Sequence, residues 1–119
     1  TKMEDTKLGV TTIAPSVIVT ISRLNTLAVP GVSRMTPTVI SRWNSTARHD
    51  NEGVKVKIVD SKIYLDLYVV IKSSENVRLV AESIQERVNR AISEIIGMEV
   101  AQINVHVTDI DIDVETSTL

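Results

Sequence analysis

The sequence predicts an α+β fold, a two-layer sandwich in which two helices cover one face of a small mixed β-sheet. Three observations predict this class. Residues 54–72 and 100–108 carry apolar side chains at every second position, residues 76–96 carry them at every third or fourth position, and these segments alternate along the chain. Because 119 residues, 43% of them hydrophobic, are enough for one core, we expect a single domain over residues 10–114 with the order β-α-β-β-α-β.

The beginning of the chain is predicted to contain a frayed segment, a short strand and a helix. Residues 1–9 are polar and should be frayed, and residues 10–13 are a strand candidate. In residues 15–28 the β-branched residues favour a strand, but Pro15 suits a first helical turn and the apolar residues recur at helical spacing, so we predict a helix. Its predicted apolar stripe consists of Val17, Ile18, Ile21, Leu24 and Ala28.

The segment 33–52 has no hydrophobic period and is predicted to be a long loop, with a short helical turn around residues 39–43. It is polar and contains a proline, two asparagines and several basic residues. A loop of this length in a compact domain is usually functional or mobile.

A β-hairpin is predicted over residues 54–72. Valine and isoleucine alternate with lysine in its first half, which is the pattern of a half-buried strand. Asp60 and Ser61 make a tight turn, and a longer strand follows at residues 63–72. In this strand the odd-numbered aliphatic residues point one way, and Tyr64 and Tyr68 point the other way.

The clearest helix of the chain is predicted at residues 76–96. It should begin at a Ser-Ser-Glu-Asn cluster and end at Gly97, which suits a left-handed C-terminal position. A last strand follows at residues 100–108, and a change of phase at its end predicts a bulge near Thr108. The strands that flank this helix should be parallel and joined by a right-handed crossover. Residues 115–119 are predicted to be a polar tail.

The residues offer no constellation that carries catalysis. The chain has no cysteine, which excludes thiol nucleophiles, disulfides and thiolate zinc sites. It has no Gly-x-Ser-x-Gly elbow, and its four glycines form no phosphate loop. His106 should point outward into solvent, and His49 and Asp50 are adjacent residues, which rarely face one another. We predict a protein that is not an enzyme and uses no cofactor or small-molecule substrate, with a hydrolase centred on His49 and Asp50 as a third hypothesis.

Three aspartates at the end of the last strand are the candidate metal ligands. Asp109, Asp111 and Asp113 alternate with apolar residues, so their carboxylates lie on one side of an extended chain and could attract Ca²⁺ or Mg²⁺. The segment lacks the glycine that an EF-hand loop needs at its sixth position. We interpret the acidic run as the guard of an edge strand or a solvated tail, and we predict no bound metal.

Charge is distributed unevenly along the chain, whose net charge is −2. Residues 1–62 hold nine Lys/Arg against five Asp/Glu, and residues 63–119 hold four against ten. Opposed charge of this kind can support head-to-tail association, although the simpler interpretation is that both charged faces are only solvated. A nucleic-acid-binding or anion-binding module that uses residues 34–57 is the alternative. The candidate interaction residues are Trp43, Arg42, Arg48, Lys55, Lys57, Tyr64 and Tyr68.

The hairpin, the second helix and the last strand together form a specific pattern. Its segments are PGV at 30–32, GVKV at 53–56, IYLDLYVV at 63–70, VAESIQERV at 80–88, GMEV at 97–100 and INVHV at 103–107. This pattern resembles the alkaline shock protein family of Gram-positive envelope-stress proteins over residues 10–32 and 53–110. The chain departs from the family at Lys72-Ser73-Ser74, where the family has Tyr-Gly, in a first helix that is not alanine-rich, and in residues 33–52.

The resemblance implies a cytoplasmic protein of the envelope stress response that is not an enzyme. Family members associate with the membrane through a separate anchored partner and assemble with copies of themselves, and no catalytic residues carry over. Our leading hypothesis is an interaction module that self-associates and docks to a membrane-anchored partner. No apolar run reaches the ~18 residues of a transmembrane helix and no signal-type leader is evident, so we expect a soluble protein, cytoplasmic or peripheral to the membrane.

Overall fold

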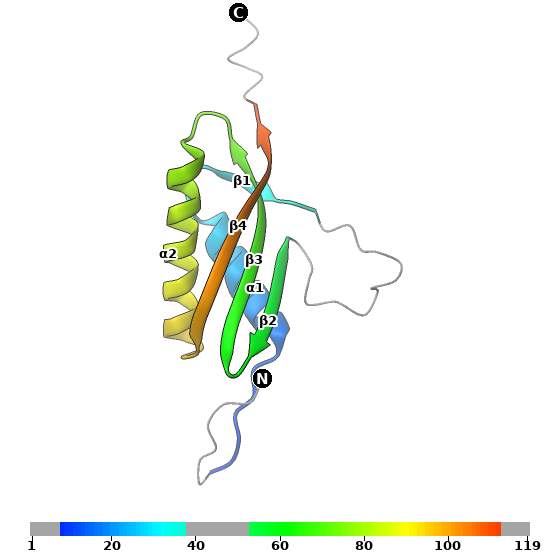
Figure 1. Cartoon of the computed structure of the whole chain (residues 1–119), viewed down its shortest axis with the longest axis vertical. Helices are drawn as coiled ribbons and strands as arrows, with labels where there is room; N and C mark the ends of the chain where they lie inside the picture. Colours follow the sequence, from blue (N-terminus) through cyan, green and yellow to red (C-terminus); the bar gives the residue numbers. More distant parts are fainter. Residues whose placement is uncertain (1–7, 38–52, 113–119) are drawn as a thin grey trace, which may run out of the picture.

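The computed structural model of the chain describes residues 8–37 and 53–112. In these residues a mixed four-stranded sheet has both helices packed on one of its faces (Figure 1). The elements in chain order are α1 (Pro15–Leu27), β1 (Val32–Met35), β2 (Val54–Val59), β3 (Lys62–Lys72), α2 (Val77–Ile95) and β4 (Glu99–Asp111). The predicted α+β class and its two-layer arrangement are confirmed.

β3 is the central strand of the sheet. β4 runs parallel to it along one side, with Lys62 opposite Glu99 and Lys72 opposite Asp111. On the other side, β2 pairs antiparallel with the first half of β3, and β1 pairs antiparallel with the second half. The sheet therefore has one continuous edge, formed by β4, and one divided edge, formed by β2 and β1 (Figure 1). The predicted hairpin and the predicted parallel crossover are both confirmed.

The first strand of the sheet does not lie where we predicted it. Residues 10–13 form no strand, and only Gly9 and Thr12 take part in isolated bridges. The strand β1 follows α1 instead, in a segment that we predicted to begin the loop 33–52. Residues 38–52, which include the predicted helical turn, lie outside the described residues.

β1 forms because it pairs with β3, and its own sequence shows no pattern that would predict a strand. Its four residues are too few to show a period. The chain on either side of β1 also bonds to β3, since Lys72 N donates to Gly31 O and Thr36 N donates to Tyr68 O, both at 2.9 Å. This tertiary contribution explains why the local sequence indicated a loop.

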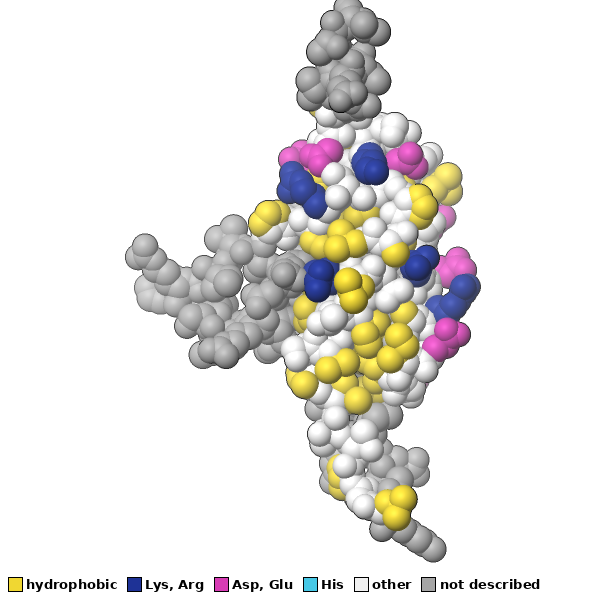
Figure 2. Space-filling view, turned by 180° about the vertical axis from the view of Figure 1, so that it is seen from behind, with side chains coloured by type: hydrophobic (Ala, Val, Ile, Leu, Met, Phe, Trp, Pro, Cys, Tyr) yellow, Lys and Arg dark blue, Asp and Glu magenta, His cyan; other side chains and the backbone are white. Residues whose placement is uncertain are grey.

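α1 forms where predicted, but its buried face coincides only in part with the predicted stripe, since Ile18 is buried and Ile21 packs against the core. Pro15 occupies its first turn, as expected. Val17 and Leu24 of the predicted stripe are 43% and 54% exposed. Ser22 and Thr26 complete the buried face beside Ile18 and are small enough to let the helix lie close to its neighbours. Figure 2 shows apolar side chains gathered on this helical side of the molecule. The residues that α1 buries are Ile18, Val19, Ser22 and Thr26.

The core lies between the helices and the inward face of β3. Asn76 caps α2 by accepting a hydrogen bond from Leu79 N at 3.1 Å, and Gly97 follows its end with a φ of 80°, as predicted. Neither helix of the described residues combines the length and the apolar character that a membrane span requires. The fully buried residues of β3 and α2 include Ile63, Leu65, Leu67, Val69, Ile71, Ile84, Val88 and Ile92.

A turn and three register irregularities shape the sheet of the described residues, one of them in β1 between Val32 and Arg34. Asp60 and Ser61 both have positive φ, 50° and 63°, which gives the hairpin turn a twist that fits its strands. Thr108 is an extra residue of β4 without a register partner on β3, so the predicted bulge is confirmed. A second bulge at Ala101 leaves that residue exposed, although the period of two would place it inward.

Candidate interaction surface

Within the described residues, no helix covers the face of the sheet opposite α1 and α2. On β3 the odd-numbered residues face the core, and the even-numbered residues from Tyr64 to Tyr68 are half-buried on this second face. β2 places two lysines beside them, and β4 places an amide and an imidazole on their other side. We call this set the open face: Lys55, Lys57, Tyr64, Asp66, Tyr68, Asn104 and His106.

Asp66 lies at the centre of the open face and links β3 to β4. Its Oδ1 accepts a hydrogen bond from Asn104 Nδ2 at 3.1 Å and is bonded to His106 Nε2 at 2.9 Å. The parallel register explains both contacts, because Asn104 lies opposite Asp66 and His106 follows two residues later on the same face. The three polar side chains therefore hold one another in place.

Aromatic contacts extend this network across the sheet. The rings of Tyr68 and His106 stack with their centroids 4.5 Å apart and their planes at 15°. Lys55 Nζ lies 5.5 Å from the centroid of the Tyr68 ring, within the range of a cation–π contact. Lys55 also lies opposite Asp66 in the hairpin register. A continuous series of contacts thus runs from β2 through β3 to β4.

The pKa of the Asp66 carboxyl lies below its usual value. The hydrogen bond from His106 is the main cause, partial burial acts in the opposite direction, and Asn104, the charge of His106 and the charge of Lys55 lower the pKa further. Asp66 is therefore ionised at neutral pH, and an ionised carboxylate only accepts hydrogen bonds. It follows that His106 donates through Nε2.

Four of the seven predicted interaction residues lie on the open face: Lys55, Lys57, Tyr64 and Tyr68. Lys57 lies opposite Tyr64 in the hairpin, so each tyrosine has a lysine of β2 as a neighbour. His49 and Asp50, the residues of the third hypothesis, lie outside the described residues. The same holds for the other three interaction candidates, Trp43, Arg42 and Arg48.

Asp66 and Asn104 were not predicted from the sequence, and His106 was predicted without a partner. The outward direction predicted for His106 is right, since its side chain is 44% exposed, but the ring is bonded and stacked. The position of Asp66 between two tyrosines on one strand face was an available signal. The hydrogen bond between Asp66 and Asn104 joins residues 38 positions apart. It could be predicted only from the register of β4 against β3, which no local sequence pattern contains.

The acidic end of β4 is engaged with its own chain. Asp111 accepts a hydrogen bond from Ser33 Oγ and lies 3.5 Å from Arg34 Nη2. The Ser33 hydrogen bond is the main cause of a lowered Asp111 pKa, desolvation opposes it, and Arg34 adds to it. Asp109 accepts a hydrogen bond from the backbone N–H that follows it. No three His, Cys, Asp or Glu side chains gather within 8–37 and 53–112, and Asp113 lies outside these ranges.

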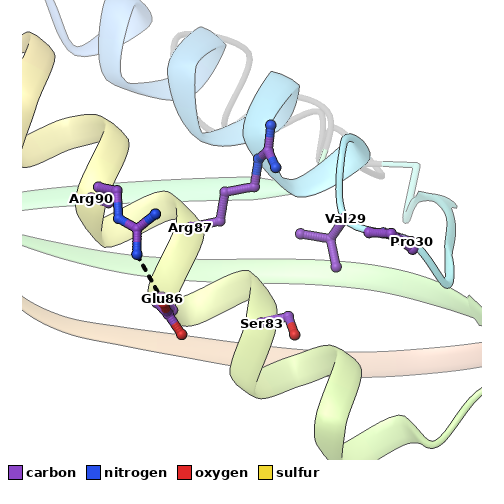
Figure 3. A pocket seen from close by; sticks show the side chains of 6 residues that line it. All are labelled: Val29, Pro30, Ser83, Glu86, Arg87 and Arg90. Atoms are coloured by element: carbon purple, nitrogen blue, oxygen red, sulfur yellow. Dashed lines mark hydrogen bonds and ion pairs between the residues drawn. The ribbon is translucent and has the colours of Figure 1, made fainter.

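A shallow pocket of about 240 Å³ lies between α2 and the turn that follows α1 (Figure 3). Val29 and Pro30 form one wall, and side chains of α2 form the other. On that second wall Arg90 is paired with Glu86 at 2.9 Å, and Ser83 has no base as a hydrogen-bond partner among the described residues. The pocket therefore lacks the paired nucleophile and base of a covalent catalytic site.

Sequence comparison assigns the chain to a family. The sequence profile of the family of alkaline shock protein 23, described by a cell envelope-related function, matches residues 3–112. The chain is also 32% identical over 114 residues to YqhY of Bacillus subtilis (strain 168), a protein described as uncharacterized. This alignment covers 92% of the chain and 83% of YqhY.

Solved structures share the fold at low sequence identity. The C-terminal domain of MamM superposes with a TM-score of 0.55 and 13% identity, covering 81% of this chain and 99% of that domain. A copper form of a variant of the same domain gives a TM-score of 0.55 at 12% identity, with 81% and 98% covered. Such identities establish a common fold and nothing about ligands or partners.

Proposed function

Because the chain belongs to the alkaline shock protein 23 family, whose function is related to the cell envelope, we propose that it is a non-enzymatic interaction module of the envelope stress response. It works in the cytoplasm, self-associates and docks to a membrane-anchored partner. The open face of the sheet is the surface that receives this partner.

The observation that supports this proposal is the bonded and stacked network on the open face. Asp66, Tyr68 and His106 are fixed by one another before a partner arrives, so less conformational entropy is lost on binding. Flat aromatic groups with hydrogen-bonding atoms are the residues that dominate binding at protein interfaces. A sheet surface of this kind suits a macromolecule, whereas small substrates bind in concave pockets.

The charges of the open face define the partner's chemistry. Lys55 and Lys57 alternate on β2, and Lys57 has no ion-pair partner in the part of the chain that the structure describes. Asp66 is satisfied by its neighbours on β4. A docked segment should therefore present acidic groups toward β2 and apolar or aromatic groups toward Tyr64 and Tyr68.

Retention of membrane proteins by the immobilised chain tests the docking proposal. Detergent-solubilised membranes of the source cell are passed over the wild-type chain, a Tyr68→Ser variant and a Leu79→Ser variant. Leu79 is the matched control, because it is a 59% exposed apolar residue on α2, away from the open face. We expect wild type and Leu79→Ser to retain the same integral membrane protein and Tyr68→Ser to retain about tenfold less.

Two outcomes contradict the docking proposal. One is equal retention by all three proteins, which would place the contact elsewhere. The other is retention that follows thermal stability across the variants, which would make Tyr68 a structural residue only. Light scattering over a range of concentrations tests the self-association separately, and a strict monomer at every concentration and at low salt would contradict it.

A further inference from the structure

The outer edge of β4 is long and unguarded at its centre. Among the described residues β4 pairs with β3 only, and it is 13 residues long. Edge strands usually protect themselves with charged side chains, prolines or short length. The segment between the bulges at Ala101 and Thr108 holds neither Lys, Arg, Asp, Glu nor Pro; its residues are Gln102, Ile103, Asn104, Val105, His106 and Val107.

The hydrogen bonds of β3 fix which backbone groups of β4 face this edge. Tyr68 N donates to Gly53 O and Tyr68 O accepts from Thr36 N, so the backbone of Tyr68 faces β2 and β1. In a pair of parallel strands, when the backbone N–H and C=O of one residue point away from the partner strand, those of the opposite residue point toward it. His106 lies opposite Tyr68, so the backbone groups of His106 point toward β3. The backbone N–H and C=O groups of Ile103, Val105 and Val107 therefore point away from β3.

A side chain of α2 supports this assignment. Gln85 Nε2 donates to Ile103 O at 3.0 Å, so this carbonyl is accessible to a donor that does not belong to β3. Ile103 is one of the three residues whose backbone faces outward. A shallow pocket lined by Gln85, Asn89, Val100 and Ile103 also lies between α2 and the edge, so α2 leaves room beside β4.

We propose that β4 pairs antiparallel with β4 of a second copy of the chain, about a two-fold axis at Val105. This pairing joins two four-stranded sheets into one continuous sheet. This inference rests on the self-association in the proposed function and identifies the outer edge of β4 as the surface through which two copies associate. Gln85 releases the Ile103 carbonyl when the second copy arrives.

The register is self-complementary in side chains and in backbone groups. Val105 lies opposite its own copy, and Ile103 lies opposite Val107 of the second copy, so the three outward-facing residues form the hydrogen-bonded pairs. On the open face Asn104 lies opposite His106 of the second copy. Aliphatic residues thus meet aliphatic residues on the inner face, and an amide meets an imidazole on the open face.

The acidic ends of β4 do not oppose this register. It brings Glu99 near Asp111 of the second copy, and like charges that meet across strands are unfavourable. Each carboxylate has a cation of its own chain, because Lys62 Nζ lies 3.8 Å from Glu99 Oε2 and Arg34 Nη2 lies 3.5 Å from Asp111 Oδ1. The repulsion is therefore offset before the two copies meet.

Proline substitution at equivalent positions of the two edges tests the pairing by light scattering. Val105→Pro removes the central donor and should raise the dimer dissociation constant about 100-fold, because two symmetric hydrogen bonds are lost at about tenfold each. Val56→Pro is the matched control, since Val56 is also a half-buried valine with an outward-facing backbone, on β2. We expect Val56→Pro to leave the dissociation constant within about twofold of wild type.

Cross-linking provides a readout that does not depend on how well the proline variants fold. The chain has no cysteine, so Val105→Cys and Val56→Cys each carry a single thiol. With a short bis-maleimide, the Val105→Cys protein should yield covalent dimers at least about tenfold faster than the Val56→Cys protein, because the two-fold axis places the Val105 side chains about 5.5 Å apart.

The outcomes separate this inference from the proposed function. Equal cross-linking of the two cysteine variants, or self-association that Val105→Pro leaves unchanged, overturns the pairing while self-association stands. A wild-type chain that never exceeds the monomer mass overturns both.

Discussion

The two faces of β3 have different roles, although their residues alternate along one strand. Leu65 and Leu67 have no exposed surface and pack against the helices. Asp66 and Tyr68, their direct neighbours in the chain, are half-buried and bond to β4 and β2 side chains. One face supplies the hydrophobic free energy of folding, and the other presents polar and aromatic groups held in fixed positions.

This contrast indicates how a chain with few aromatic residues can offer a defined surface. Aromatic residues make up 3% of the sequence, and Phe is absent. The core is filled by Val, Ile, Leu and two Met side chains, so both tyrosines remain available for the open face. Changes on the core face should therefore alter stability, and changes on the open face should alter binding.

Leu65→Ala should produce the largest loss of stability. The fully buried side chain leaves a cavity, and we expect the free energy of unfolding to fall by about 3 kcal/mol. Urea denaturation measures this loss, with Asp66→Ala as the neighbouring control at less than about 1 kcal/mol. Equal losses in the two variants would contradict the division between the faces.

His106→Ala should give the largest loss of binding for a small loss of stability. The ring is 44% exposed, so the free energy of unfolding should fall by less than about 1 kcal/mol. Loss of the Tyr68 stack and of the Asp66 hydrogen bond should reduce retention of the proposed membrane-anchored partner about tenfold. Retention at the wild-type level by a folded His106→Ala protein would count against the open face.

Ser22→Ala should stabilise the chain. Ser22 Oγ is buried and has no hydrogen-bond partner among the described residues. Removing this hydroxyl from α1 and introducing alanine should raise the free energy of unfolding by about 1 kcal/mol, with binding unchanged. Thr26→Ala is the control and should destabilise, since Thr26 is buried and its Oγ1 donates to Ser22 O at 2.7 Å. A less stable Ser22→Ala protein would show that the hydroxyl has an unrecognised role.

Acid should weaken the open face by the smallest amount. The pKa of Asp66 is lower in the folded chain than its ordinary value of 3.8, so the unfolded chain takes up this proton first. The ionised carboxylate therefore contributes stability above about pH 4, and the contribution is lost as the pH falls through the lowered folded pKa. Because the side chain is 36% exposed, we expect less than about 1 kcal/mol.

The Asp66→Asn variant isolates this contribution. Wild type and variant are unfolded in urea at pH 5 and at pH 2.5, and their difference in unfolding free energy should shrink at the lower pH. A difference that is constant or grows on acidification would contradict the predicted direction of the pKa shift.

Long periodic segments of the sequence predicted their structures well. The hairpin turn at Asp60–Ser61, the helix that ends before Gly97 and the bulge at Thr108 all follow from spacing and turn chemistry. β1 was missed because a four-residue strand has no period and is selected by the edge of β3. The buried face of α1 was predicted only in part: Ile18 and Ile21 contact the core as expected, whereas the burial of the small polar residues Ser22 and Thr26 leaves no signal in a hydrophobic pattern.

The open face was only half predictable. The alternation of residues 63–72 places Tyr64 and Tyr68 together, and the hairpin turn fixes the lysines of β2 beside them. The contacts of Asp66 with Asn104 and His106 depend on the register of β4 against β3, and the bulge at Ala101 shifts this register by one residue. Local patterns contain no information on that shift.

Amide hydrogen exchange at low and high protein concentration tests most directly whether the sheet, and not the helices, carries the contacts between copies. We predict that the amides of Ile103, Val105 and Val107 become protected as the concentration rises, while the exposed side of α1 exchanges unchanged. New protection over α1 and α2, with β4 unchanged in a self-associating sample, would contradict the assignment of these contacts to the sheet.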